Sequence, residues 1–351
     1  MKKLVSVLLI AAMMFAMVAC GGDDTTDDGD AVGGSAKVGL GITVSLSADA
    51  ATEDADGNAQ QDGTAAAVLL DSEGKIVKCL VDVAQNKMAF TVEGEVLDKD
   101  KDFVTKKNLK EEYGMGPVSP LEEGEWYQQI AVFEDYVVGM TRDDVANIAT
   151  TVNDSGHTVG TDEALTAGCT MDISSFIEAV VQACDKAVDA GEATDLHLGI
   201  VSDMASSKDA TEDEDGVAFS TSTYAATATD ADGKITAALV DCTQSKITIG
   251  VDGSVVDVPE TVTTKKDLKE DYGMGPVSPL EEGEWYQQIA AFEGYVVGMT
   301  KDDVANIATT VNDSGHTVGT DEALTAGCTM DISDFIAAIV EIGRASCRER
   351  V

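Results

Sequence analysis

The chain contains two nearly identical stretches, TMDISSFIEAVV at residues 170–181 and TMDISDFIAAIV at residues 329–340. In both stretches apolar residues recur three and four positions apart, which is the spacing of one face of an amphipathic helix. The match extends outward, because residues 105–174 and 264–333 differ at only five positions. The chain therefore carries one unit twice, and equivalent residues lie 159 positions apart.

The first half of each unit has the pattern of strands. Val38, Leu40, Ile42 and Val44 alternate with glycine or hydroxyl residues, which is the period of a strand with one buried face. Two further strand-like segments flank a turn cluster of aspartate, serine and glycine, and a third follows them. We expect strands at residues 64–70, 75–82 and 87–92, and in the second copy on both sides of residues 230–233 and at 246–251.

The second half of each unit has the pattern of helices. Trp126, Ile130 and Phe133 share one helical face, and Thr141 with Asp144 has the spacing of a capping box. Strands followed by helices predict an α+β fold, in which each copy has an N-terminal, mostly antiparallel sheet followed by about three helices. We place repeat domain 1 at residues 37–190 and repeat domain 2 at residues 195–341; these are called repeat 1 and repeat 2.

The N-terminus has the layout of a secretory signal. Lys2 and Lys3 precede an apolar stretch at residues 4–17, and small residues then precede Cys20. The apolar stretch is shorter than the about 20 residues that a membrane-spanning helix needs. Met-Val-Ala-Cys at residues 17–20 resembles the lipobox of bacterial lipoproteins, in which the cysteine is acylated and becomes the new N-terminus.

This resemblance implies a location. We expect residues 1–19 to be a lipoprotein signal peptide, Cys20 to be lipidated, and residues 20–36 to form an acidic flexible tether. The protein would then be extracytoplasmic and anchored to the cell membrane. An ordinary signal peptide that happens to contain a cysteine is the alternative.

The C-terminal residues 342–351 have a different composition from the rest of the chain. They hold three of its four arginines, and they interrupt the repeat alignment within an amphipathic pattern. Their sequence resembles the translation of a sequencing adapter, so we expect this segment to be an artefact and the true C-terminus to be missing. The alternative is a native basic tail.

The net charge argues against some classes of ligand, and the cysteine content argues against a disulfide-built scaffold. The formal net charge of −41 opposes binding to nucleic acid and to anionic lipid headgroups. Only Cys169 and Cys328 are equivalent cysteines that form a repeat pair, and the chain has no CxxC motif. Buried free thiols are therefore expected rather than a disulfide framework.

The segment before each C-terminal helix resembles the signature of the FMN-binding domain family. In that family Ser/Thr-Gly-Ala-Thr precedes an amphipathic helix, and its last threonine is esterified to the FMN phosphate by a flavin-attaching enzyme. The matching residues here are Thr170 with Gly168, and Thr329 with Gly327. The resemblance implies FMN as cofactor and electron transfer outside the membrane. The sequence departs from the motif at Cys169, where alanine is expected, and at Ala167, where serine or threonine is expected. The nearest aspartate, Asp162, lies two residues too far upstream.

A physical argument supports an anion at the start of each C-terminal helix, and helix capping is a simpler explanation of the same residues. Free N–H groups at a helix start favour a phosphate, and a glycine lets the backbone approach it. Equally, Thr170 or Asp172 is explained as a helix cap.

Other polar features leave two explanations open. Lys106, Lys107 and Lys110 form a basic cluster that suits either an anionic ligand or a solvated helix face. His157 and its equivalent His316 suit a polar surface loop better than a metal site. No hydrolase or transferase motif occurs in the sequence. We therefore expect a binding or carrier module rather than an enzyme, either carrying FMN or, alternatively, binding a solute or a surface component without a cofactor.

Overall fold

The structure, a computed structural model, describes residues 35–101 and 103–341. The expected signal peptide, the lipidation site Cys20, all of the tether except its last two residues, and the adapter-like segment lie outside these residues. All described residues belong to one compact unit.

The strands of repeat 1 form an antiparallel sheet in the order β3-β2-β1-β6. A separate small hairpin joins β4 to β5. The strands are β1 (Ala36–Asp49), β2 (Gly57–Leu70), β3 (Ile76–Phe90), β4 (Thr150–Val152), β5 (Thr158–Gly160) and β6 (Val188–Gly191).

Helices of repeat 1 follow its long strands, as the sequence predicted. The three longest are α2, α3 and α5, and short helical turns connect them. The helices are α1 (Lys106–Leu109), η1 (Lys110–Tyr113), η2 (Gly116–Val118), α2 (Trp126–Tyr136), α3 (Arg142–Ala146), α4 (Glu163–Thr166) and α5 (Ser174–Asp185).

Repeat 2 has the same order of long strands and helices, with its sheet in the order β10-β9-β8-β7, but its fourth strand β10 follows and pairs with β9, whereas β6 of repeat 1 follows α5 and pairs with β1. Its strands are β7 (Asp195–Asp203), β8 (Gly216–Thr229), β9 (Ile235–Ile249), β10 (Val255–Asp257), β11 (Thr309–Val311) and β12 (Thr317–Gly319). Its helices are α6 (Lys265–Leu268), η3 (Lys269–Tyr272), η4 (Gly275–Val277), α7 (Trp285–Val296), α8 (Lys301–Ala305), α9 (Glu322–Thr325) and α10 (Ser333–Val340). The predicted α+β fold with two copies of one unit is confirmed.

Two strand predictions, at residues 87–92 and 246–251, were wrong in their boundaries. Residues 246–249 are the end of β9, which runs without a break from Ile235. Residues 87–92 are not a separate strand, because β3 continues from Ile76 to Phe90 and pairs with β2 along its whole length. Polar residues interrupt the apolar alternation at Asn86. That residue is nevertheless buried, and its side-chain amide donates to Ser202 Oγ of repeat 2 at 2.8 Å.

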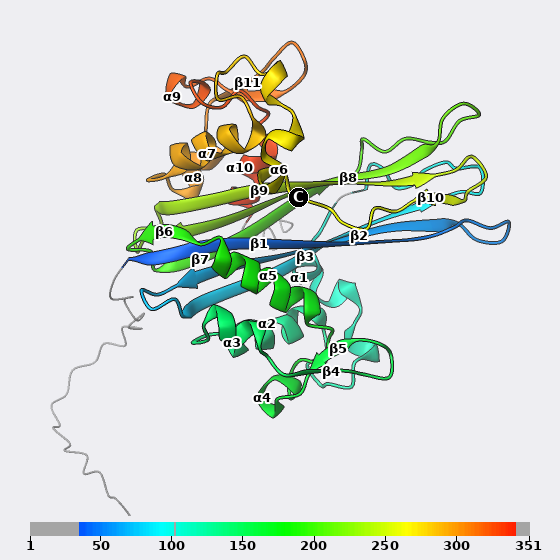
Figure 1. Cartoon of the computed structure of the whole chain (residues 1–351), viewed down its shortest axis with the longest axis horizontal. Coiled ribbons are helices and arrows are strands. Elements are labelled where there is room, and N and C mark those ends of the chain that lie inside the picture. The colour runs from blue at the N-terminus through cyan, green and yellow to red at the C-terminus, as the bar shows by residue number, and fades with distance from the viewer. Residues whose placement is uncertain (1–34, 102, 342–351) are drawn as a thin grey trace, which may run out of the picture. The chain divides into compact units, whose positions relative to one another are not determined.

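Each sheet has two covered faces. One face packs against the helices of its own repeat, around Trp126, Phe133 and Phe176 in repeat 1 and the equivalent residues in repeat 2. The opposite faces of the two sheets pack on each other through small side chains, including Ala65 and Ala67 from β2. Figure 1 shows the helices of the two repeats on opposite sides of the paired sheets.

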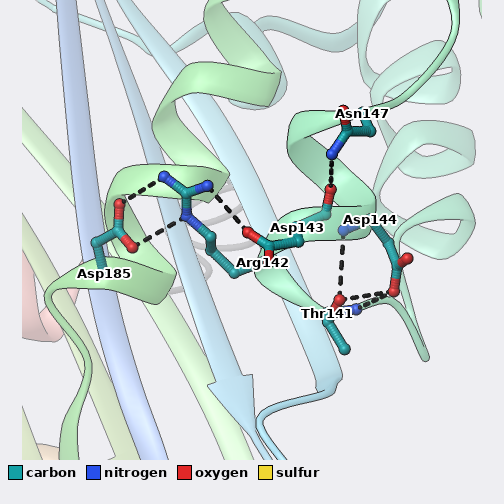
Figure 2. A network of polar contacts seen from close by, with 6 residues as sticks. All are labelled: Thr141, Arg142, Asp143, Asp144, Asn147 and Asp185. Carbon is teal, nitrogen blue, oxygen red and sulfur yellow. Dashed lines mark hydrogen bonds and ion pairs between the residues drawn. The ribbon is translucent and has the colours of Figure 1, made fainter.

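A polar network fixes the start of α3 against the end of α5 (Figure 2). The Thr141 side chain caps the Asp144 amide, and Asp144 Oδ2 accepts from the Thr141 amide at 2.9 Å, as the predicted capping box requires. Arg142 donates to both carboxylate oxygens of Asp185, at 3.0 Å and 3.1 Å. Repeat 2 has Lys301 in place of Arg142.

No helix within the described part of the chain is both long enough and apolar enough to cross a membrane. The cysteines in this part of the chain are free thiols, as expected. Four of them are buried and Cys184 is partly buried.

Candidate ligand-binding site

A pocket of about 530 Å³ lies in repeat 2, on the side of the sheet that faces the helices. Thr221 and Thr223 of β8 and Cys242 of β9 contribute its sheet wall. The rest of the lining comes from two chain segments, 265–288 and 316–335, and consists of Lys265, Tyr272, Met274, Val277, Ser278, Pro279, Trp285, Gln288, His316, Thr329, Met330, Asp331, Asp334 and Phe335.

Two aromatic side chains of the lining are almost fully buried. Trp285 and Phe335 are 3% and 6% exposed, and their rings meet edge to face with centroids 6.0 Å apart. Val277, by contrast, is 82% exposed and lies at the rim. The lining combines eight apolar or aromatic residues with nine polar or charged ones, and the volume of the pocket is within the range of binding sites for small organic molecules.

A buried glutamine holds the loop that carries Thr329. Gln288 Oε1 accepts from the Thr329 amide at 2.9 Å and from the Thr329 hydroxyl at 3.3 Å. The amide nitrogen of Gln288 donates to Gly283 O at 2.9 Å and to Ser278 Oγ at 3.1 Å. Because both ends of this amide are satisfied, Gln288 fixes three pocket-lining residues, itself included, relative to one another.

A partly buried ion pair positions the short helix α6. Lys266 Nζ lies 2.5 Å from Glu293 Oε1, and the Lys266 amide donates to Asp241 Oδ1 at 3.0 Å. Burial raises the pKa of both Glu293 and Asp241, and nearby hydrogen bonds together with Lys266 oppose that increase. The anchor at Lys266 leaves the preceding residue, Lys265, at the pocket.

Lys265 is held by aromatic rings. Its Nζ lies 4.8 Å from the centroid of the Tyr272 ring and 5.6 Å from that of the Trp285 ring. Both distances are within the range of cation–π attraction. A cation therefore borders the aromatic wall of the pocket.

Asp331 caps the start of α10. Its Oδ1 accepts from the Ser333 amide at 2.9 Å, and its Oδ2 accepts from the Thr317 amide at 2.8 Å. Partial burial would raise the pKa of Asp331, but these hydrogen bonds and that from the Ser333 hydroxyl outweigh it and lower the pKa. Asp172 makes the same contacts in repeat 1, so a carboxylate of the chain itself meets the helix start in both copies.

The threonines and glycines selected from the sequence have different surroundings. Thr329 lines the pocket, and Thr170 makes the same two hydrogen bonds to Gln129 in repeat 1. Gly168 and Gly327 instead permit close helix packing. A Cβ atom added at Gly168 would lie 2.7 Å from Val132 Cγ2, and one at Gly327 would lie 2.6 Å from Ala291 Cβ.

The histidines of the repeated loop are exposed at a hairpin turn. His157 Nδ1 lies 3.9 Å from Asp172 Oδ2, and His316 Nδ1 lies 3.8 Å from Asp331 Oδ2. His316 also lines the pocket. Within the described ranges, no group of three or more metal-ligating side chains comes together.

Repeat 1 differs from repeat 2 at three lining positions. Asp62, Val83 and Ser175 stand where repeat 2 has Thr221, Cys242 and Asp334. The first difference changes the pairing of the lysine, because Lys106, the equivalent of Lys265, lies 3.4 Å from Asp62 Oδ1.

Sequence reasoning did not identify Gln288 or Tyr272. Gln288 lies 41 positions from Thr329, and no spacing rule connects them. The lysine cluster at Lys106, Lys107 and Lys110 was noted in repeat 1, but the sequence did not show that its equivalents in repeat 2 would have different roles, with Lys266 in an ion pair and Lys265 at a pocket.

No protein-family model matches the chain, and neither a curated protein nor a solved structure matches it.

Proposed function

We propose that repeat 2 is a binding module for a small organic molecule with a planar ring system, held in the pocket lined by Trp285, Tyr272 and Phe335. The observation that supports this proposal is the pocket itself, since its volume of about 530 Å³ suits a ligand of that size. Together with the expected lipid anchor at Cys20, it makes the protein a carrier or binding component outside the cell membrane.

Aromatic side chains favour a planar ligand. Ring stacking and edge contacts add to the burial of apolar surface, and such contacts suit flat molecules. Polar groups fix orientation in pockets of this kind, and here the carboxylate of Asp334 and the hydroxyl oxygen of Thr329 provide acceptors.

Covalent FMN at Thr329 is the second candidate function. The position of Thr329 in the wall that also contains Trp285 favours it, because the same pocket offers aromatic surface to a flavin ring. The start of α10 offers less to the phosphate, because Asp331 already accepts from the Ser333 amide there. In this proposal Thr329 holds the phosphate, and the flavin supplies redox chemistry when bound.

Intrinsic fluorescence tests reversible binding directly. The chain has two tryptophans, so Trp126→Phe leaves Trp285 as the only one. We expect riboflavin or FMN to change the fluorescence of Trp285 saturably. Trp285→Phe, which keeps only Trp126, reports on repeat 1 as the matched control. Absence of a saturable signal and of any rise in melting temperature with these flavins and with adenosine would overturn the proposal.

Mass spectrometry tests covalent attachment. The protein is produced together with a flavin-attaching enzyme, and its intact mass is compared with those of Thr170→Ala and Thr329→Ala. We expect a mass increase of one FMN, less water, that Thr329→Ala abolishes. An unmodified mass for the wild-type protein removes the FMN candidate and leaves reversible binding to be judged by fluorescence.

A further inference from the structure

A second hollow adjoins the pocket of repeat 2 and shares Lys265 and Tyr272 with it. It has a volume of about 400 Å³. Three residues of β9 line it next to a loop at residues 259–263, and its full lining is Gln244, Ser245, Lys246, Pro259, Thr261, Val262, Thr263, Lys265, Leu268 and Tyr272. The shared residues make the hollow a continuation of the proposed ligand site.

The charge of this hollow is opposite to that of the whole chain. Lys246 and Lys265 both line it, and no carboxylate is among the described residues of its wall. The chain as a whole has a formal net charge of −41. A local excess of positive charge in such an acidic protein is a site where an anionic group is stabilised against the general repulsion.

These two lysines keep their hydrogen-bond capacity for a ligand. Within the part of the chain that the structure describes, neither forms an ion pair. Lys246 Nζ lies 5.7 Å from the centroid of the Phe219 ring, and Lys265 lies over Tyr272 and Trp285. A ring face attracts the ammonium group without accepting its three N–H donors as a carboxylate would.

In repeat 1 a carboxylate neutralises the lysine that is equivalent to Lys265. Its Asp62 carboxylate lies 3.4 Å from Lys106 Nζ and accepts from Gln85 Nε2 at 2.7 Å. Thr221 replaces Asp62 in repeat 2, so Lys265 has no equivalent carboxylate. The Asp62/Thr221 difference therefore leaves Lys106 in an ion pair and Lys265 without one, although Asp334, which replaces Ser175, also lines the adjoining pocket, where the charge of Lys265 opposes the rise in the pKa of Asp334.

We infer that the Lys246–Lys265 hollow is an anion subsite, which holds the phosphate or carboxylate group of a ligand whose ring lies in the adjoining pocket. This inference rests on the proposed function for the position of the ring. It adds the chemical class of the ligand, an aromatic anion.

FMN and riboflavin are a matched pair for the test, because they differ by one phosphate. Binding of each to the full chain is measured by Trp285 fluorescence in Trp126→Phe, and by calorimetry with the unmodified sequence. We expect FMN to bind about tenfold more tightly at low ionic strength, since hydrogen bonds to charged groups contribute this much, and the advantage to shrink in salt.

Substitutions test whether the tighter binding of FMN than of riboflavin depends on the hollow. Lys246→Gln and Thr221→Asp should each remove most of the preference for FMN, the second by giving Lys265 the carboxylate that Lys106 has. Lys106→Gln in repeat 1 is the matched control and should keep the preference. Equal affinities for the two flavins, or a preference that survives Lys246→Gln combined with Lys265→Gln, would contradict the anion subsite alone.

A failure of the proposed function gives a different result from a failure of the anion subsite. If neither the flavins nor adenosine bind, the planar-ligand proposal is wrong, and inorganic phosphate then tests the hollow by itself. Phosphate should raise the melting temperature of the wild-type protein more than that of the Lys246→Gln, Lys265→Gln variant. An equal change in both proteins would overturn the inference.

Discussion

The hydroxyl oxygen of Tyr224 occupies the space that a side chain at Gly63 would need, since a Cβ atom added there would lie 2.0 Å from it. Gly63 belongs to β2 of repeat 1 and Tyr224 to β8 of repeat 2. Tyr224 is fully buried, and its hydroxyl lies 3.2 Å from Thr243 Oγ1. This contact therefore joins the two repeats through a residue that differs between them.

Gly63→Ala should destabilise the protein by about 1–3 kcal/mol, because extra atoms in a closely packed interior force shifts in their neighbours. Urea denaturation measures the effect. In a Tyr224→Phe background the added methyl group should cost less, because the atom it clashes with has been removed. Gly294→Ala is the control. Its Cβ would meet nothing within 4 Å, and the change in helix α7 should be neutral or stabilising. A Gly63→Ala variant as stable as wild type would contradict the described packing.

The network around α3 allows a cap and an ion pair to be compared. Thr141→Ala should cost about 1 kcal/mol because it exposes an unpaired helix amide, and Thr300→Ala should cost a similar amount in repeat 2. Asp185→Asn should cost less than about 1 kcal/mol, because its partner Arg142 is 43% exposed and water screens the pair. Added salt should reduce only the Asp185 effect. Denaturation at two salt concentrations measures both, and a larger loss for Asp185→Asn would contradict this ranking.

Buried Glu293 predicts a pH dependence with a defined sign. Burial raises its pKa in the folded protein above the ordinary value of 4.5, so the folded state binds this proton more tightly than the unfolded state. Its contribution to stability is therefore present at low pH and is lost as pH rises from the unfolded pKa through the folded pKa. Glu293→Gln cannot lose a proton, so its stability relative to wild type should increase with pH in this window. Unfolding free energies measured from pH 4 upward test this.

The exposed Glu281 supplies the control for that experiment. Glu281→Gln should give a curve parallel to that of the wild type. If the stability of Glu293→Gln relative to wild type instead fell with rising pH, the assigned direction of the Glu293 pKa would be wrong.

Cys242 lines the pocket, and alkylation of its thiol can be measured. Burial raises the pKa of its thiol to about 11, so at pH 8 roughly one thiol in a thousand is ionised. We expect slow alkylation by iodoacetamide in the folded protein and fast alkylation in denaturant, as measured by peptide mapping. The pKa of Cys184 is also raised to about 11, but this residue is only partly buried, so it should react faster than Cys242.

A ligand in the pocket should protect Cys242 from alkylation and leave Cys184 unchanged, because only Cys242 lines the pocket. Equal protection of both thiols would indicate a general change in stability instead of occupancy of the pocket.

The sequence predicted those features that depend on neighbouring residues. The spacing of Ile173, Phe176 and Val180 predicted α5, and the Thr141–Asp144 pair predicted the start of α3; both are confirmed. Contacts between distant segments were not predictable in this way. Asn86 appeared to end a strand because its partners, Ser202 and Ser222, lie more than a hundred residues away.

In the candidate site, too, the sequence predicted local features and did not predict contacts between distant segments. Thr329 could be selected because it directly precedes an amphipathic pattern. The roles of Gln288, Lys265 and Tyr272 depend on how α6, α7 and the loop before α10 meet, which no local pattern specifies. The contrast between Asp62 and Thr221 was visible in the sequence, but it gained meaning only when Lys106 and Lys265 were placed beside them.

The alanine-rich contact between the two sheets has a consequence for how this protein could have diversified. A lone copy of the unit would present the sheet face that its own helices leave uncovered, so the second copy acts as a built-in partner, as in a dimer fused into one chain. Both copies must preserve that shared interior. The pocket proposed to bind a ligand is not shared, and one copy is therefore free to change it while the other remains a scaffold.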